Sequence, residues 1–162
     1  MKSLIIIRHA KSSWDFSTLN DFDRPLNERG HKDAPMMAKR LLDKQITIDA
    51  FISSTAKRAF TTAAYFAEAY DVKEKNIIKI PELYHAAPVV FYDVIKTVDD
   101  SLNCIALFSH NPGITDFVNQ LTNTKIDDMP TCAVFAVNIK IESWKKFADA
   151  EKDFWFFDYP KR

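Results

Sequence analysis

The sequence predicts a single α/β domain, a three-layer α/β/α sandwich whose central sheet is mostly parallel. Short apolar runs alternate along the chain with segments whose apolar residues recur at helical spacing. The 162 residues fit one domain with a sizeable core, and no repeat, low-complexity tract or linker divides residues 1–162. With 47% hydrophobic residues, the chain is expected to fold rather than to be disordered.

The first predicted strand covers residues 3–8 and ends abruptly at Arg8 and His9. It contains four consecutive apolar residues, three of them isoleucines, which is typical of a fully buried strand. Further strands are predicted over residues 49–53, 77–80 and 104–108, and residues 133–141 and 154–157 are expected to form an antiparallel pair at the sheet edge.

Helices are predicted between these strands. Asn27 is the expected N-cap of the first helix, and Pro35 lies within its apolar pattern. That helix is therefore expected either to start late or to bend at the proline. A second helix follows residue 56, a third carries Pro88 in its first turn, and Pro112 opens a fourth.

The loop over residues 9–26 exceeds the usual length of a connection, which indicates a functional lid. Its aromatic residues Trp14, Phe16 and Phe22 are candidates to line the entrance of a site.

The composition excludes several classes of protein. The 22 basic and 22 acidic residues balance, which argues against bulk electrostatic binding of nucleic acid. No apolar stretch is long enough to span a bilayer, and the amino terminus lacks a signal-peptide pattern. Cys104 and Cys132 lack the spacing of a metal site, so reduced, buried thiols in a cytoplasmic protein are expected. Two glycines are too few for a glycine-rich nucleotide loop.

Three of the predicted strands end in polar or cationic residues. The first ends at Arg8 and His9, and the others lead into residues 53–58 and 109–113. Because the carboxyl ends of parallel strands share one edge of a sheet, these residues are expected to meet where ligands bind in open α/β folds. The second and third ends also open helices, whose free backbone N–H groups attract anions. The sequence therefore predicts an anion pocket.

Arg58 and the two histidines of these strand ends are the candidate binding groups. A cation in the first turn of a helix opposes the helix dipole by about 0.3–1 kcal/mol, so an isolated Arg58 would be expected to bend into solvent. A bound anion would reverse this argument. His9 and His110 each follow a buried strand, and the nearby arginines disfavour a divalent metal while matching the oxygens of a phosphate.

These residues resemble the histidine phosphatase superfamily, most closely its small SixA-type phosphohistidine phosphatase branch. The superfamily commonly has glycine at the position of Ala10, whereas the small branch often has Ala-Lys-Ser there, as this chain does. The matching segments run in order over about two thirds of the chain: residues 8–12, 23–30, 53–63, 81–84 and 109–113.

The resemblance implies a phosphoglycerate mutase-like fold and a phosphatase that needs no metal or other cofactor. It implies that His9 attacks phosphorus and forms a phosphohistidine intermediate that water then hydrolyses. Arg8, Arg58 and His110 would hold the phosphoryl oxygens and stabilise their charge. Arg24 is a further candidate for the pocket, although an ordinary loop salt bridge explains it equally well. The remaining candidates for substrate binding are Lys11, Ser12 and Asn111.

The residues leave three alternatives for the general acid: Glu82, Asp23, or no general acid at all. A phosphate ester leaves as an alkoxide unless a carboxylic acid supplies a proton, and Glu82 matches where much of the superfamily places that acid. A phosphohistidine makes a smaller demand, because its imidazole departs neutral when the other ring nitrogen is protonated. Glu82 would then serve only to orient a group, and a solvated surface position is the alternative for both carboxylates.

The predicted function is therefore a metal-independent phosphatase that removes phosphate from phosphohistidine on a protein. The short chain favours this substrate weakly, since it leaves little room for insertions that would enclose a small metabolite. The alternatives are a phosphatase or mutase for a small phosphomonoester, and a non-catalytic phosphate-binding module. Neither nucleic acid nor membrane is expected as a partner, and a monomer or weak dimer is expected.

Overall fold

A central mixed sheet organises the molecule. In the computed structural model, which describes residues 1–15 and 19–161, the sheet has six strands in the order β3-β2-β4-β1-β5-β6. Neighbours from β3 to β1 pair in parallel, whereas β5 is antiparallel to β1 and to β6. The mostly parallel sheet is confirmed; β6 is its edge strand and β5 lies inside. The strands are β1 (Lys2–Arg8), β2 (Ala50–Ser53), β3 (Ile78–Lys79), β4 (Cys104–Ser109), β5 (Val134–Ile139) and β6 (Lys152–Asp158).

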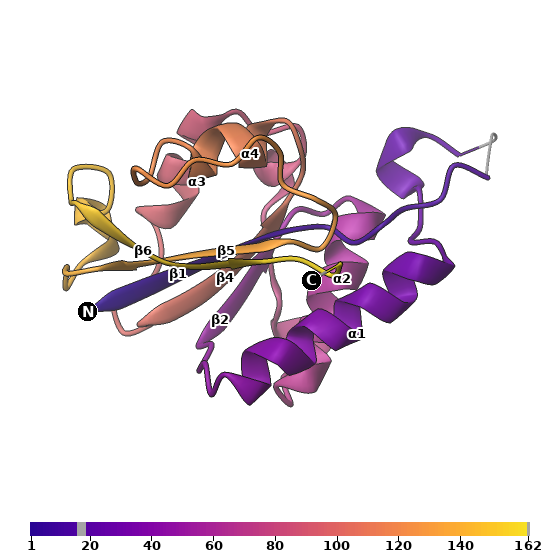
Figure 1. Ribbon diagram of the computed structural model, residues 1–162, viewed down its shortest axis with the longest axis horizontal. Helices are drawn as coiled ribbons and strands as arrows, with labels where there is room; N and C mark the ends of the chain where they lie inside the picture. The colour runs from indigo at the N-terminus through magenta and orange to yellow at the C-terminus, as the bar shows by residue number, and fades with distance from the viewer. Residues whose placement is uncertain (16–18, 162) are drawn as a thin grey trace.

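Helices cover both faces of the sheet, so the predicted three layers are present. Figure 1 shows α1 and α2 on one face and α3 and α4 on the other. The helices are α1 (Glu28–Asp43), α2 (Lys57–Ala69), α3 (Pro88–Ile95) and α4 (Gly113–Val118). Among the helices of the described residues, none is long and apolar enough to cross a membrane.

Strand β1 explains why two cores form. Its residues Leu4 and Ile6 belong to the apolar cluster under α3 and α4, while Ile5 and Ile7 belong to the cluster under α1 and α2. All four side chains are fully buried. Successive side chains of a strand point to opposite faces, so an unbroken apolar run is what a strand covered on both faces requires.

The first helix begins where its cap predicts. The Asn27 side chain accepts a hydrogen bond from the backbone N–H of Gly30, and α1 starts at Glu28 and runs through Pro35. The predicted late start is therefore wrong: the cap and the apolar face of α1 outweigh the backbone hydrogen bond that Pro35 cannot donate. The predicted reduced, buried thiols agree with the structure, in which Cys104 and Cys132 are free and buried.

The parallel register aligns the carboxyl ends of three strands. Arg8 of β1 lies opposite Ser109 of β4, and Ser53 of β2 lies opposite Phe108 of β4. The residues that follow these strands therefore emerge together at one edge of the sheet, as the sequence predicts.

Gly113, the first residue of α4, allows a close approach that shapes this edge. A Cβ atom there would overlap the backbone carbonyl oxygen of Ala86. We expect Gly113→Ala to lower the free energy of unfolding by about 1–3 kcal/mol, because backbone has to shift to admit the methyl group. Urea unfolding measures this loss. Gln120→Ala, at an exposed site just beyond α4, is the control, and equal stability of the two variants would contradict the close approach.

Candidate active site

A hollow of about 170 Å³ opens where β1, β2 and β4 end. Larger surface hollows exist, such as one of about 510 Å³ walled by Glu68, Asp71 and Glu74, but it lacks this convergence of cations. Of the ten residues that line the smaller hollow, eight are site residues that the sequence predicts: Arg8, His9, Lys11, Ser12, Arg24, Arg58, His110 and Asn111; the other two are Trp14 and Thr131.

His9 is held as a neutral base with one free nitrogen. Its Nδ1 lies 2.7 Å from the carbonyl oxygen of Ala10. A carbonyl only accepts, so Nδ1 carries the hydrogen and Nε2 keeps its lone pair. Burial first, and then the charges of His110, Arg58 and Arg8, hold the pKa of His9 well below its usual range, against the opposing Ala10 hydrogen bond. A neutral imidazole with a free Nε2 is a nucleophile.

Three buried N–H groups that belong to residues lining the hollow have no partner. They are Nε of Arg8, Nε of Arg58 and Nδ1 of His110, each without a hydrogen bond to any described residue. Each donor comes from a different strand end. Leaving a buried polar group unsatisfied is costly, so three such groups around one hollow indicate a site built for a ligand with several acceptor oxygens.

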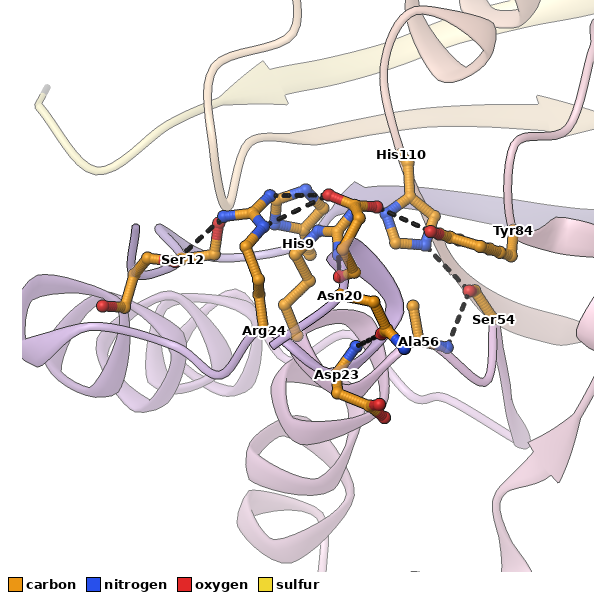
Figure 2. A network of polar contacts seen from close by, with 12 residues as sticks. His9, Ser12, Asn20, Asp23, Arg24, Ser54, Ala56, Tyr84 and His110 are labelled. Atoms are coloured by element: carbon orange, nitrogen blue, oxygen red, sulfur yellow. Dashed lines mark hydrogen bonds and ion pairs between the residues drawn. The ribbon is translucent and has the colours of Figure 1, made fainter. Parts of the chain in front are cut away.

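His110 is positioned by Ser54, which the sequence analysis placed only among the polar residues 53–58 after a predicted strand. The Ser54 hydroxyl lies 2.8 Å from Nε2 of His110 and also accepts the backbone N–H of Ala56 (Figure 2). When Ser54 donates to Nε2, the neutral ring carries its hydrogen on Nδ1, the unpartnered atom. Burial first, and then the charge of Arg58, lower the pKa of His110 to about 3.

Arg58 is buried, so the solvent-exposed alternative for it is wrong. Its Nη1 donates to the backbone carbonyl of Asp21 at 2.6 Å, and its Nη2 lies 2.9 Å from the Asp21 carboxylate. The same carboxylate accepts the Tyr84 hydroxyl at 2.6 Å and pairs with Arg24 at 3.1 Å. Although burial alone would raise it, hydrogen bonds from Tyr84, Arg58 and Arg24 hold the pKa of Asp21 well below its usual range.

Asp21 is therefore a candidate site residue that the sequence analysis missed. It lies in a short 3-10 helix, Asp21–Asp23, and its carboxylate ties together two guanidinium groups of the hollow. The available signal was its position three residues before Arg24, a spacing that places two side chains of a helical turn together.

Arg24 combines both of its predicted roles, because it forms the loop salt bridge and also lines the hollow. It donates to the Ser12 hydroxyl at 2.7 Å and to the Ser13 carbonyl at 3.1 Å (Figure 2). The Trp14 ring lies 3.5 Å from its guanidinium carbon, so this residue of the loop does reach the hollow. Phe22 instead packs edge-on against Tyr84, and Phe16 lies outside the described residues.

The structure does not bring Glu82 or Asp23 to the hollow. Glu82 lies in the 3-10 turn Pro81–Leu83, which buries Leu83 and leaves Glu82 exposed. Asp23 is exposed as well. Asn111 does line the hollow, with its amide hydrogen-bonded to Asp128 at 2.8 Å. Among the described residues, no three His, Cys, Asp or Glu side chains are grouped so as to hold a metal ion.

Substituting Arg58 tests the anion site. We expect Arg58→Lys to weaken the binding of inorganic phosphate about tenfold, since lysine keeps the charge but loses the planar fork and Nε–H. Isothermal titration calorimetry measures this change. Lys57→Ala removes the neighbouring cation, which is exposed and outside the hollow, and should leave affinity within about twofold. Native affinity in Arg58→Lys would contradict the assignment.

The buried histidines predict a pH dependence of stability. Their folded-state pKa values lie below 6.5, so the unfolded chain takes up protons that the folded chain refuses, and stability falls with pH below about 6.5. We expect the free energy of unfolding to drop by about 1–2 kcal/mol per histidine between about pH 6.5 and pH 5. Urea unfolding at both pH values measures the slope. His110→Asn should flatten it, and an unchanged slope would contradict the shifted pKa of His110.

Comparisons with known proteins agree with this fold and identify a family. The model of the histidine phosphatase superfamily (branch 1) matches residues 4–84, half of the chain. An uncharacterized chloroplastic protein of Arabidopsis thaliana is 28% identical over 90% of this chain and 70% of its own length. Phosphoserine phosphatase 1 of Hydrogenobacter thermophilus is 39% identical, over 49% of this chain and only 39% of its own length.

Solved structures confirm the fold over the whole chain. The protein histidine phosphatase SixA complexed with tungstate superimposes with a TM-score of 0.82 at 19% identity, covering 98% of this chain and 97% of that one. A mycobacterial glucosyl-3-phosphoglycerate phosphatase gives a TM-score of 0.68 at 12% identity, covering 96% and 97%. The fold is thus the phosphoglycerate mutase-like α/β fold, and the family match establishes that this chain belongs to the histidine phosphatase superfamily, branch 1.

Proposed function

We propose that this chain is a metal-independent phosphatase that works through a phosphohistidine at His9 and takes its phosphate from phosphohistidine on a protein. The observation that carries the proposal is the set of three unpartnered, buried N–H donors around a neutral His9. A phosphoryl group supplies acceptor oxygens for these donors, and phosphorus faces the free Nε2.

The reaction divides into two displacements. In the first, Nε2 of His9 forms a bond to phosphorus while the bond to the leaving group breaks and takes its electron pair with it. The ring of His9 becomes cationic, with its Nδ1–H held by the Ala10 carbonyl. In the second, water attacks phosphorus, the P–N bond breaks and its electron pair returns to His9. Dihydrogen phosphate leaves, carrying both hydrogens of the water.

The surroundings of the hollow favour phosphohistidine over an ester. The Asp21 carboxylate at its arginines is held ionised, and Glu82 and Asp23 are exposed and outside the lining, so none of the three is placed as a proton donor. An imidazole protonated on its other nitrogen leaves neutral without such a donor, whereas an alkoxide requires one. The structural similarity to the protein histidine phosphatase SixA supports the same substrate class.

A small phosphomonoester is the second candidate. It is favoured by the relatives named phosphoserine phosphatase and glucosyl-3-phosphoglycerate phosphatase, although the first shares only about half of this chain and the second only the fold.

The decisive measurement is phosphate release from a phosphohistidine-bearing protein by the native chain and by His9→Ala. We expect release by the native chain, unaffected by a chelator, and a loss of at least about a thousandfold in His9→Ala, since the covalent route disappears. His31→Ala is the matched control, because His31 is exposed on α1 and outside the hollow.

Other outcomes separate the alternatives. Release from phenyl phosphate alone would favour the ester candidate, and phosphate binding without release from either substrate would indicate a binding module. Activity restored by zinc after chelation would contradict the metal-independent mechanism.

A further inference from the structure

A second hollow, of about 230 Å³, adjoins the first. Both are lined by His110 and Asn111, whereas the cations Arg8, Arg24 and Arg58 line only the first. A phosphoryl group held by the cations therefore has this second space beside it, since His110 and Asn111 line both hollows. The proposed two-step transfer through His9 gives the second hollow no role.

One wall of the second hollow is His85, which has an uncommon backbone conformation. Its φ of 58° lies in the left-handed region that residues other than glycine seldom adopt. Its ring lies 3.9 Å from the ring of Tyr84, which in turn is 5.5 Å from the ring of His110. Strained residues gather at functional sites, where the surroundings hold them in place. The exposed His85 ring is thus in contact with Tyr84, which lies beside His110 of the phosphoryl site.

The remaining wall is apolar except for one carboxylate. Ala86, Ala87, Pro88 and Pro112 line it, and the absence of a side chain at Gly113 lets α4 approach the Ala86 carbonyl. Asp116 of α4 contributes the carboxylate; within residues 1–15 and 19–161, it has no ion pair or side-chain hydrogen bond. A flat ring with one N–H group matches such a space, because its faces meet apolar atoms and its N–H meets the carboxylate.

We propose that the second hollow holds the leaving group of the reaction, an imidazole ring whose N–H is accepted by the Asp116 carboxylate while His85 packs beside it. This inference rests on the proposed function and names the residues that select its leaving group.

Atoms and charge balance in the phosphoryl transfer that this arrangement serves. The substrate enters with phosphorus on one ring nitrogen and hydrogen on the other, so its ring is cationic and is favoured by Asp116. As Nε2 of His9 bonds to phosphorus, the P–N bond of the substrate breaks and its electron pair neutralises the departing ring. The positive charge passes to the ring of His9, and the departing imidazole keeps its N–H on Asp116.

The test compares two substrates that differ in leaving group, a phosphohistidine peptide and phenyl phosphate. We expect Asp116→Asn to lower kcat/KM for the peptide about tenfold more than for phenyl phosphate, since only the peptide offers a cationic ring to the carboxylate. Asp93→Asn is the matched control: Asp93 is a carboxylate of α3, paired with Lys96 and outside both hollows, and its loss should leave the ratio unchanged. Melting curves establish that both variants fold.

Equal losses on the two substrates, or no loss on either, would overturn the proposal. So would a His85→Ala variant that loses phenyl phosphate activity and keeps peptide activity, because His85 would then be a proton donor for esters.

Binding of imidazole gives a readout independent of turnover. In the native chain saturated with inorganic phosphate, imidazole should shift the amide NMR signals of Ala86, Ala87 and Asp116, and Asp116→Asn should weaken this binding. If the native chain hydrolyses neither substrate, the proposed function fails, and this titration decides about the hollow by itself: no shift at these residues overturns the leaving-group site.

Discussion

Parallel pairing of β1 with β4, and of β4 with β2, is the constraint on which the site depends. It brings three strand ends to one edge of the sheet, with Arg8 opposite Ser109 and Ser53 opposite Phe108. The proposed nucleophile and three unpartnered donors come from segments about fifty residues apart in sequence, and only this register assembles them. The two apolar cores on either face hold the register, because a slip of one residue would turn Leu4 and Ile6 into the other core.

The Asp21 carboxylate offsets the repulsion between the cations that meet at the site. The guanidinium groups of Arg24 and Arg58 repel one another, and the repulsion grows where water is displaced. The Asp21 carboxylate pairs with Arg24 and Arg58 at the rim and leaves Nε of Arg58 and Nδ1 of His110 unsatisfied inside. Arg58 is thus held in place while its Nε–H stays without a partner. Tyr84 donates to the same carboxylate, so the loop after β3 is tied to this arrangement.

The sequence predicts the sheet, its layers and the residues at the strand ends, because these follow from apolar periodicity and from polar residues placed directly after strands. It does not predict the path of a long loop or which of its side chains reach the site. Asp21 meets the arginines of the hollow only through the path of the loop over residues 9–26, and Glu82 turns outward because the adjacent Leu83 is buried instead. The pairing of Ser54 with His110 likewise depends on side-chain direction at two strand ends, which periodicity does not determine.

The same electrostatics connects binding to chemistry. In the proposed mechanism, burial and the neighbouring cations keep His9 and His110 neutral before a phosphoryl group arrives, so Nε2 of His9 is free to attack. A bound dianion reverses the sign of the local potential and favours the imidazolium that forms on His9 during transfer. Without a bound phosphoryl group, the site therefore carries excess positive charge. This charge is balanced as the P–N bond to His9 forms, and catalysis requires such a gain in stabilisation on the way to the transition state.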